Sequence, residues 1–388
     1  MSVRVLWLTE HHPPSRGGMA QSSDRIVRGL RTAGLAVDVA QIAHAPRRAQ
    51  KTRGQGGHHV VWPIDDDPEH ALRSLWIELE RLHHGGGADG GYTHVIAFGG
   101  TLPLLSGPTY AAWLGVPLVT LLRGNDFDTG LFSVRRRDVV TTALAASAAV
   151  CTVASGNVAL IEALVQPAGT AAPAGPEVVW ITNGIDATEW EPLPSERARA
   201  ATWRAEHVEP DRVTIGLIGQ LKRKKGAVFF LEALAASRFA SSTHVILVGD
   251  AEAELVDWLA KHDTTITASQ LPFLDRYELL GYYPACDLVA LPSFYDGLPN
   301  VALEAAALGL PLLTSDAGGL RDLVTDGEHG FVFASGDASG CRAAIDRALS
   351  ATGETRAALG AAAAARVRRD FTAEAETQRY VELLSSIS

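Results

Sequence analysis

Cysteine is scarce in this chain of 388 residues, which has only Cys151, Cys286 and Cys341. No two of them form a Cys-x-x-Cys pair, and Cys151 and Cys286 lie in apolar, strand-like segments. This pattern argues against a disulfide framework or a cysteine-rich metal site and favours buried free thiols in a reducing compartment. No apolar run approaches the length of a membrane span, and the one near the N-terminus is too short for a signal peptide. We therefore expect a cytoplasmic protein.

Positive charge is also in short supply. Lys and Arg number 34 against 44 acidic residues, so the net charge is −10, which argues against nucleic-acid binding. Only five of the 34 are lysines, and three of these fall in the single stretch KRKK, residues 222–225. The stretch follows a strand-like segment and precedes a helix-like one. We expect Lys225 to bind an anion, the alternative being an ordinary solvated loop.

Apolar residues are plentiful at 47%, and they form short runs that alternate with helical patterns. This alternation predicts an α/β fold with parallel sheets and crossover helices, and the length favours two doubly wound, Rossmann-like domains. We place an N-terminal domain at 1–188 and a second at 189–371, with the amphipathic segment 372–388 after it. Residues 43–58 are interpreted as a mobile loop and 85–91 as a flexible connector. The expected strands are 4–9, 36–42, 59–64, 94–98, 117–122, 149–154, 178–182, 212–219, 244–250, 287–292 and 311–315.

The stretch SFYDGLPNVALEAAALGLP, residues 293–311, follows one of these strands and places two acids around a helix start. Gly297 permits tight backbone geometry, and Pro299 suits the first turn of a helix. A helix that begins there would direct its positive dipole end towards the loop, which favours an anion. Asp296 would lie in front of that anion and Glu304 about one turn into the helix, where both could accept hydrogen bonds from hydroxyl groups. An unpaired Glu304 in so apolar a helix would be costly, which favours a ligand contact.

Here the sequence resembles family 4 of the retaining glycosyltransferases. Five segments resemble the family's motifs in the family's order: HHPPSRGGMA, ITNGID, GLIGQLKRKKG, the pair HVILVGD with RYELLGYYPACD, and PSFYDGLPNVALEAAALGLP. The resemblance implies the GT-B fold, in which two Rossmann-like domains face each other across a cleft. It also implies that the terminal helix crosses back to the first domain.

The resemblance further implies roles for individual residues. Glu304 would hold the ribose of a nucleoside-diphosphate sugar, Asp296 the donor sugar, and Lys225 the diphosphate that leaves. Backbone groups around the turn would contact the sugar or the diphosphate. The expected donor contacts are Gln220, Gly297, Leu298, Pro299, Asn300 and Gly18.

Acceptor contacts are expected in the first domain, at Gly17 and in LLRGNDFD, residues 121–128. Gly17 and Gly18 fit either a loop that approaches substrate or a simple turn. The family often has His-Gly-x-Asp where this chain has Arg123 to Asp126. Arg123 or Asn125 could replace that histidine, or Arg123 could bind an anionic acceptor, or it could pair with Asp126 or Asp128. The adjacent histidine pairs, such as His11 and His12, favour structural roles, and no metal site is expected.

The resulting prediction is a retaining, metal-independent glycosyltransferase without a cofactor. It would transfer a sugar from a nucleoside-diphosphate sugar to a hydroxyl of a small molecule or glycan. Gln220 for the usual arginine, Asp296 for glutamate and Arg123 for histidine depart from the family pattern. They keep open a catalytically silent sensor of nucleotide sugars. A nucleotide-sugar epimerase is a separate alternative with the same fold. No nucleic-acid partner is expected. The acidity of the chain disfavours membrane association, but the arginines at 135–137 and the Arg-rich stretch 47–53 could still meet an anionic acceptor or a membrane.

Overall fold

The computed structural model describes residues 3–44, 48–64, 67–84, 90–166, 175–262 and 265–387. Most of the predicted connector 85–91 lies outside these ranges. The chain divides into two compact units. Unit 1 comprises Met1–Asn183 and Ala373–Ser388, and unit 2 comprises Gly184–Thr372. The last segment of the chain therefore belongs to unit 1.

Unit 1 contains an eight-stranded sheet with the order β3-β4-β2-β1-β5-β6-β7-β8. All neighbouring strands are parallel except β3 and β4, which form an antiparallel hairpin. The strands are β1 (Arg4–Thr9), β2 (Ala36–Ala43), β3 (Gln50–Gly54), β4 (Gly57–Pro63), β5 (His94–Phe98), β6 (Leu118–Leu122), β7 (Ala149–Thr152) and β8 (Glu177–Trp180).

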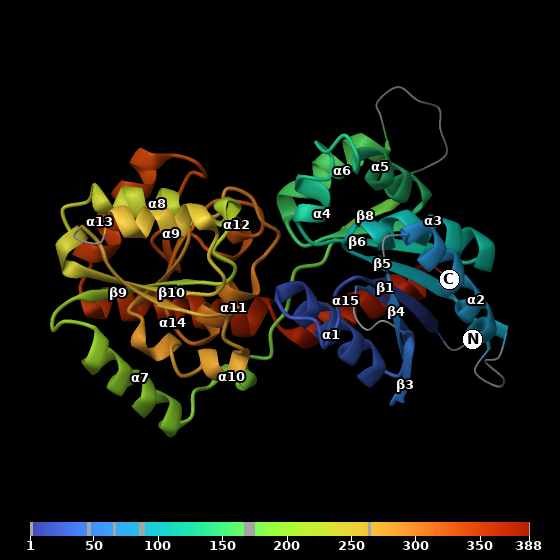
Figure 1. The fold of residues 1–388 in the computed structure, drawn as a ribbon, viewed down its shortest axis with the longest axis horizontal. Helices are drawn as coiled ribbons and strands as arrows, with labels where there is room; N and C mark the ends of the chain where they lie inside the picture. Colours follow the sequence, from blue (N-terminus) through green and yellow to red (C-terminus); the bar gives the residue numbers. More distant parts are fainter. Residues whose placement is uncertain are drawn as a thin grey trace. The chain divides into compact units, whose positions relative to one another are not determined.

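Helices cover both faces of the unit 1 sheet (Figure 1). One face packs against α2, α3, α5 and α6, and the other against α1 and the C-terminal helix α15. The helices are α1 (Gly18–Thr32), α2 (Pro68–His84), α3 (Thr101–Leu114), α4 (Asn125–Asp128), α5 (Arg137–Ala146), α6 (Val158–Val165) and α15 (Ala373–Ser386).

Unit 2 contains a six-stranded, wholly parallel sheet with the order β11-β10-β9-β12-β13-β14. In Figure 1, α8, α9 and α13 cover one face of this sheet, and α7 and α14 lie on the other, where α11 also packs. The strands are β9 (Val213–Ile218), β10 (Thr243–Val248), β11 (Thr267–Leu271), β12 (Leu288–Leu291), β13 (Leu312–Ser315) and β14 (Gly330–Phe333). The helices are α7 (Pro194–His207), α8 (Ala227–Ala235), α9 (Ala253–Lys261), α10 (Arg276–Leu279), α11 (Asn300–Ala307), α12 (Leu320–Leu323), α13 (Ala338–Ser350) and α14 (Gly353–Asp370).

The predicted α/β class with two doubly wound units is confirmed, but the expectation for residues 43–58 is wrong. Part of that stretch forms β3 and the start of β4. All five residues of β3 are exposed, so this edge strand lacks the apolar pattern by which strands are recognised in a sequence. The edge strands β11 and β14 were not expected either. Within the described residues, no helix is long and apolar enough to cross a membrane.

Candidate functional site

The sheet of unit 2 has a topological switch point beside β9. The chain runs from β9 to β10 on one side, whereas β12 pairs with β9 on the other side. In open parallel sheets, ligands bind at such a point, outside the carboxyl ends of the strands. The loops that follow β9 and β12 span 219–226 and 292–299, and they contain most of the predicted donor residues. The fold therefore brings these residues to the edge where a ligand is expected.

The loop after β9 and the loop after β12 are joined through Lys225 and Asp296. Lys225 lies in a short 3₁₀ turn, Arg223–Lys225, and its Nζ forms an ion pair with Asp296 Oδ2. The Phe294 N–H also donates to the Lys224 carbonyl at 2.9 Å. The Lys225 side chain is 27% exposed and that of Asp296 is 13% exposed, so neither is sealed from a ligand. Two residues that the sequence places 71 positions apart are thus neighbours.

Two glycines allow the loops of this edge to lie in direct contact. Gly226 has φ +71°, and a Cβ there would overlap with the Pro292 carbonyl. Gly318, in the loop after β13, has φ +51°, and a Cβ there would overlap with the Asp296 carbonyl. Its neighbour Gly319 donates its N–H to the Gly297 carbonyl at 2.7 Å. Only glycine can adopt a positive φ easily and also let another backbone carbonyl approach its Cα so closely. The position of Asp296 therefore depends on Gly226 and Gly318.

The other predicted donor residues differ in what they offer a ligand. Gly297 is buried and donates its N–H to Asp296 Oδ1 at 3.1 Å. The Leu298 side chain packs in the core, so only its backbone remains for a ligand. Pro299 is the N-cap of α11 and Asn300 its first residue, and both are partly buried. Gln220 is exposed in the loop after β9.

Glu304 lies inside α11 and is only 4% exposed. Its Oε2 accepts a hydrogen bond from the Tyr283 hydroxyl at 2.7 Å. Burial, together with the adjacent Glu304 carboxylate, holds the pKa of Tyr283 well above its usual range. The premise that Glu304 is unpaired is therefore wrong, although its contact with ribose stays a prediction. A signal was available in the sequence, since a tyrosine in the apolar stretch before β12 needs a partner for its hydroxyl.

In unit 1, Gly17 and Gly18 lie at the start of α1, in the loop that follows β1. Gly17 is the N-cap with φ +102°, and a Cβ there would meet no atom within 4 Å. Gly18 is exposed, and it is the first residue of the helix. β1 lies between β2 and β5, so this loop borders the switch point of the first sheet. The positive φ explains a glycine at position 17, and the substrate contacts of both residues stay predictions.

Arg123 follows β6, and its guanidinium points into unit 1. The side chain is 3% exposed. Its Nη2 donates to Asn183 Oδ1 and lies 4.0 Å from Glu376 Oε1, and its Nη1 donates to the Tyr380 hydroxyl at 3.3 Å. Glu376 and Tyr380 belong to α15, so the guanidinium holds the C-terminal helix rather than lying open to an anionic acceptor. Sequence reasoning missed this contact because 253 positions separate Arg123 from Glu376.

Asp126 binds its own loop. Its Oδ1 and Oδ2 accept the Arg123 backbone N–H at 3.0 and 2.9 Å. Burial raises the pKa of Asp126, and hydrogen bonds from the N–H groups of Arg123, Asp126 and Phe127 oppose that rise. The expected pairing of Arg123 with Asp126 thus exists through the backbone and not through the guanidinium. Asn125 is the first residue of α4, and its contact with an acceptor stays a prediction.

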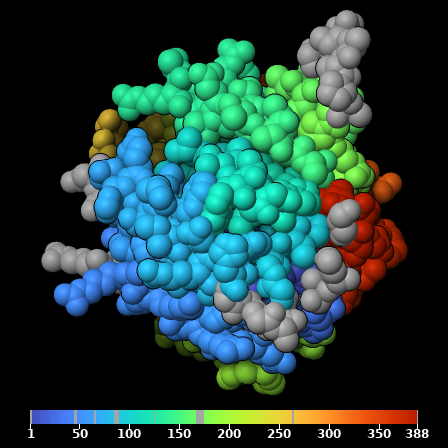
Figure 2. Space-filling view, turned by 90° about the vertical axis from the view of Figure 1, so that its right-hand side faces the viewer, coloured from blue at the N-terminus to red at the C-terminus, as the bar shows by residue number. Residues whose placement is uncertain are grey.

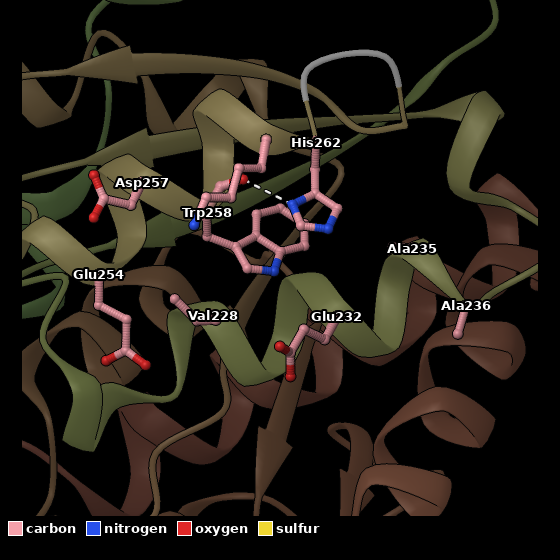
Figure 3. Close-up of a pocket in the computed structure, with 9 residues that line it drawn as sticks. Val228, Glu232, Ala235, Ala236, Glu254, Asp257, Trp258 and His262 are labelled. Atoms are coloured by element: carbon pink, nitrogen blue, oxygen red, sulfur yellow. Dashed lines mark hydrogen bonds between the residues drawn. The ribbon is translucent and has the colours of Figure 1, made fainter.

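A surface hollow of about 690 Å³ lies between α8 and α9 of unit 2 (Figure 3). Figure 3 shows the Trp258 ring under His262, whose Nδ1 is 2.8 Å from the Trp258 carbonyl oxygen. Three carboxylates line the hollow, from Glu232, Glu254 and Asp257, against the single ammonium group of Lys261, so negative charge is in excess. This charge would repel a diphosphate, so we do not assign the hollow to a nucleotide. Among the described residues, His, Cys, Asp and Glu side chains form no group of three or more that could hold a metal, and metal independence stays a prediction.

Residues 200–366, within unit 2, match the family model described as glycosyl transferases group 1. Glycogen synthase of Mycobacterium tuberculosis is 35% identical over 195 residues, which cover 50% of this chain and 44% of that protein. Alpha-maltose-1-phosphate synthase of the same organism is 31% identical over 185 residues, which cover 44% of this chain and 46% of that protein. The chain thus spans less than half the length of these two relatives.

Solved structures match nearly the whole chain. Anabaena HepE in complex with UDP and glucose is 21% identical and covers 99% of this chain and 100% of its own, with a TM-score of 0.75. Sucrose-phosphate synthase of Thermosynechococcus elongatus is 18% identical, and the match covers 99% of this chain and 98% of that structure, with a TM-score of 0.78. At such identities the likeness shows the fold, which is GT-B, and the predicted fold class is confirmed.

Proposed function

We propose that the protein is a retaining, metal-independent glycosyltransferase that uses a nucleoside-diphosphate sugar. The observation that carries the proposal is the meeting of Lys225 and Asp296 at the switch point of unit 2. This edge lies within the part of the chain that matches the glycosyl transferase family model. A cation and a carboxylate side by side suit a ligand that presents a diphosphate next to sugar hydroxyls.

In the proposed reaction, the bond between the anomeric carbon and the diphosphate oxygen breaks while the acceptor oxygen attacks from the same face. The departing diphosphate takes the proton of the acceptor hydroxyl. The Lys225 ammonium would exchange its contact with Asp296 for the diphosphate and stabilise the charge that develops there. Asp296, once released, would accept hydrogen bonds from the sugar. Removing one such electrostatic contact typically lowers turnover by about 10²–10³-fold.

UDP-glucose is the first donor to test, because HepE was solved in complex with it. The related glycogen and maltose-1-phosphate synthases favour a glycan or a small phosphorylated sugar as the acceptor class to try first. Donor binding is measured by thermal shift across nucleoside diphosphates and their sugars. A ligand at about 100 times its Kd adds roughly 2.7 kcal/mol to the stability.

The decisive comparison is Lys225→Ala against Lys222→Ala. Lys222 is exposed in the same loop and has the same charge, so it controls for the loss of one lysine. We expect Lys225→Ala to lower kcat/KM by about 100-fold or more, and Lys222→Ala to retain the wild-type value. Equal activity of the two variants would remove Lys225 from the site.

A sensor that binds nucleotide sugars without transfer is the second candidate. Gln220 favours it, because this exposed, neutral residue in the loop after β9 adds no positive charge that could stabilise a departing diphosphate. Stabilisation by a donor without its consumption, across the glycan and phosphosugar acceptors above, would support the sensor. Conversion of the donor sugar in the absence of any acceptor would instead identify an epimerase.

A further inference from the structure

The loop between α4 and α5 carries the most exposed large apolar side chains in the described part of the chain. Val134 is 98% exposed and Phe132 is 88% exposed. The next value, 66%, belongs to Tyr277, which has a polar hydroxyl. Scattered exposed leucines are normal on protein surfaces, but a phenylalanine and a valine two residues apart at these values are not.

Three arginines follow directly at positions 135–137. Among the described residues, none of them forms an ion pair. Arg136 donates through Nη2 to the neutral Thr129 hydroxyl at 2.9 Å, so its charge is not compensated. The nearest acid in the sequence is Asp138. In a chain with a net charge of −10, this is a local surplus of positive charge beside an exposed apolar pair.

The loop has an ordered backbone that holds its apolar side chains outward. The Ser133 N–H donates to the Gly130 carbonyl at 3.1 Å, and the N–H groups of Arg136 and Arg137 donate to the Ser133 carbonyl at 3.1 and 2.9 Å. Leu131, at the base of the loop, packs against the core. In Figure 2, the blue-green part of the chain, which includes this loop, protrudes along the upper edge of the view. The apolar pair is therefore presented to the outside by the fold.

We propose that this loop docks unit 1 on the surface of an anionic lipid bilayer. Phe132 and Val134 would enter the boundary between headgroups and acyl chains, and Arg135–Arg137 would contact lipid phosphates. Two apolar side chains offer too little area for a stable protein interface, which buries about 800 Å² on each partner. The same two side chains, assisted by three cations, suit shallow and reversible insertion. The overall acidity of the chain, which argues against a membrane, does not act at this patch because charges farther than about 10 Å are screened.

The proposal is tested by flotation of the whole chain with vesicles of phosphatidylcholine containing phosphatidylglycerol. We expect binding that weakens with salt and with removal of the anionic lipid. Phe132→Ser/Val134→Ser should lower the partition constant by about 10-fold or more. Arg135→Gln/Arg137→Gln should lower it by roughly 25-fold, at about fivefold per arginine. Leu193→Ser/Val256→Ser, which removes two exposed apolar side chains from unit 2, is the matched control and should bind as the wild type does.

A second measurement reports insertion directly. The three native cysteines are buried, so Val134→Cys provides an accessible thiol for an environment-sensitive dye. Anionic vesicles should shift the dye emission to the blue, and a dye on Leu193→Cys should not respond. Absence of flotation by the wild type, or flotation that the loop variants leave unchanged, would overturn the proposal. Neither outcome depends on glycosyl transfer, so the proposed function is tested separately.

Discussion

Asp296 and Glu304 lie eight residues apart, and their carboxylates have different partners. Asp296 pairs with a lysine that is partly exposed, so a ligand can compete for both groups. Glu304 accepts a hydrogen bond from a fully buried tyrosine, so its removal would disturb the core as well as any ribose contact. A loss of activity in a Glu304 variant is therefore interpretable only beside Tyr283→Phe, which removes the core contact alone.

Also at the scale of single residues, the buried His12 should make the stability of the fold depend on pH. His12 is buried, and its Nδ1 lies 3.0 Å from the Ser23 hydroxyl. Its ring packs edge-on against the ring of His59, with 4.9 Å between the ring centroids. Burial, and after it the nearby His59 and Arg31, lower the pKa of His12 from 6.5 to about 3. Between these pH values the unfolded chain binds a proton that the folded chain does not, so stability falls as the pH falls. This residue alone contributes a slope of up to about 1.4 kcal/mol per pH unit.

The measurement is urea unfolding at pH 7, 5.5 and 4.5. The slope of the unfolding free energy against pH should be smaller in His12→Asn than in the wild type. The difference should correspond to the uptake of about one proton on unfolding. His11→Asn changes the adjacent, half-buried histidine and serves as the control. An unchanged slope in His12→Asn would show that other groups cause any loss of stability in acid.

At the scale of elements, the loops at the carboxyl edge of unit 2 depend on glycine where they touch. Gly318→Ala places a methyl group against the Asp296 carbonyl and also imposes a side chain at φ +51°. Gly309 has φ +75°, and a Cβ there would meet no atom within 4 Å, so Gly309→Ala measures the backbone cost alone. We expect Gly309→Ala to cost about 1–2 kcal/mol of unfolding free energy and Gly318→Ala clearly more.

Calorimetry with nucleoside diphosphates separates the two glycine variants further. Gly318→Ala should weaken binding at least several-fold because it displaces the loop that carries Asp296. Gly309→Ala should leave the affinity unchanged. Equal affinities in the two variants would mean that the loop after β13 does not support the site.

Elements in the middle of each sheet were predictable from the sequence, whereas most of those at the edges were not. β1, β5 and β9 have strands on both sides and consist mostly of apolar residues, in the segments RVLWLT, HVIAF and VTIGLI. The edge strand β3 reads QKTRG and β11 reads TASQL, since a strand with one neighbour can expose polar side chains. The contact of Lys225 with Asp296 required the switch-point geometry, which the strand order sets and local pattern does not. The burial of Arg123 was unpredictable because its partners Glu376 and Tyr380 lie more than 250 positions away in the sequence.

At the scale of the whole molecule, the chain leaves unit 1 at Asn183 and returns to it at Ala373. The return is fixed by Glu376, which is 3% exposed and binds Arg25 Nε at 2.7 Å. Arg123 Nη2 lies 4.0 Å from Oε1 of the same carboxylate. Tyr380, Leu383 and Leu384 of α15 then pack against α1 and the sheet.

Glu376→Gln should therefore destabilise unit 1 strongly. Removal of one partner from a buried ion pair typically costs about 3–5 kcal/mol, because the remaining charges stay buried without compensation. Glu374→Gln changes an exposed acid in the first turn of the same helix and should be close to neutral. Thermal unfolding and the rate of proteolysis of α15 compare the two variants. Equal melting temperatures would show that the arginines find other partners.

The late position of α15 has a consequence for synthesis of the protein on the ribosome. Arg25 and Glu376 are separated by 351 positions, so unit 1 lacks one of its packing helices until unit 2 has been translated. Unit 2 is continuous in sequence and can fold as it emerges, since domains fold as units. Meanwhile the face of the first sheet that α15 covers stays exposed. The nascent chain therefore completes its second unit before its first, and this interval is when it depends most on chaperones.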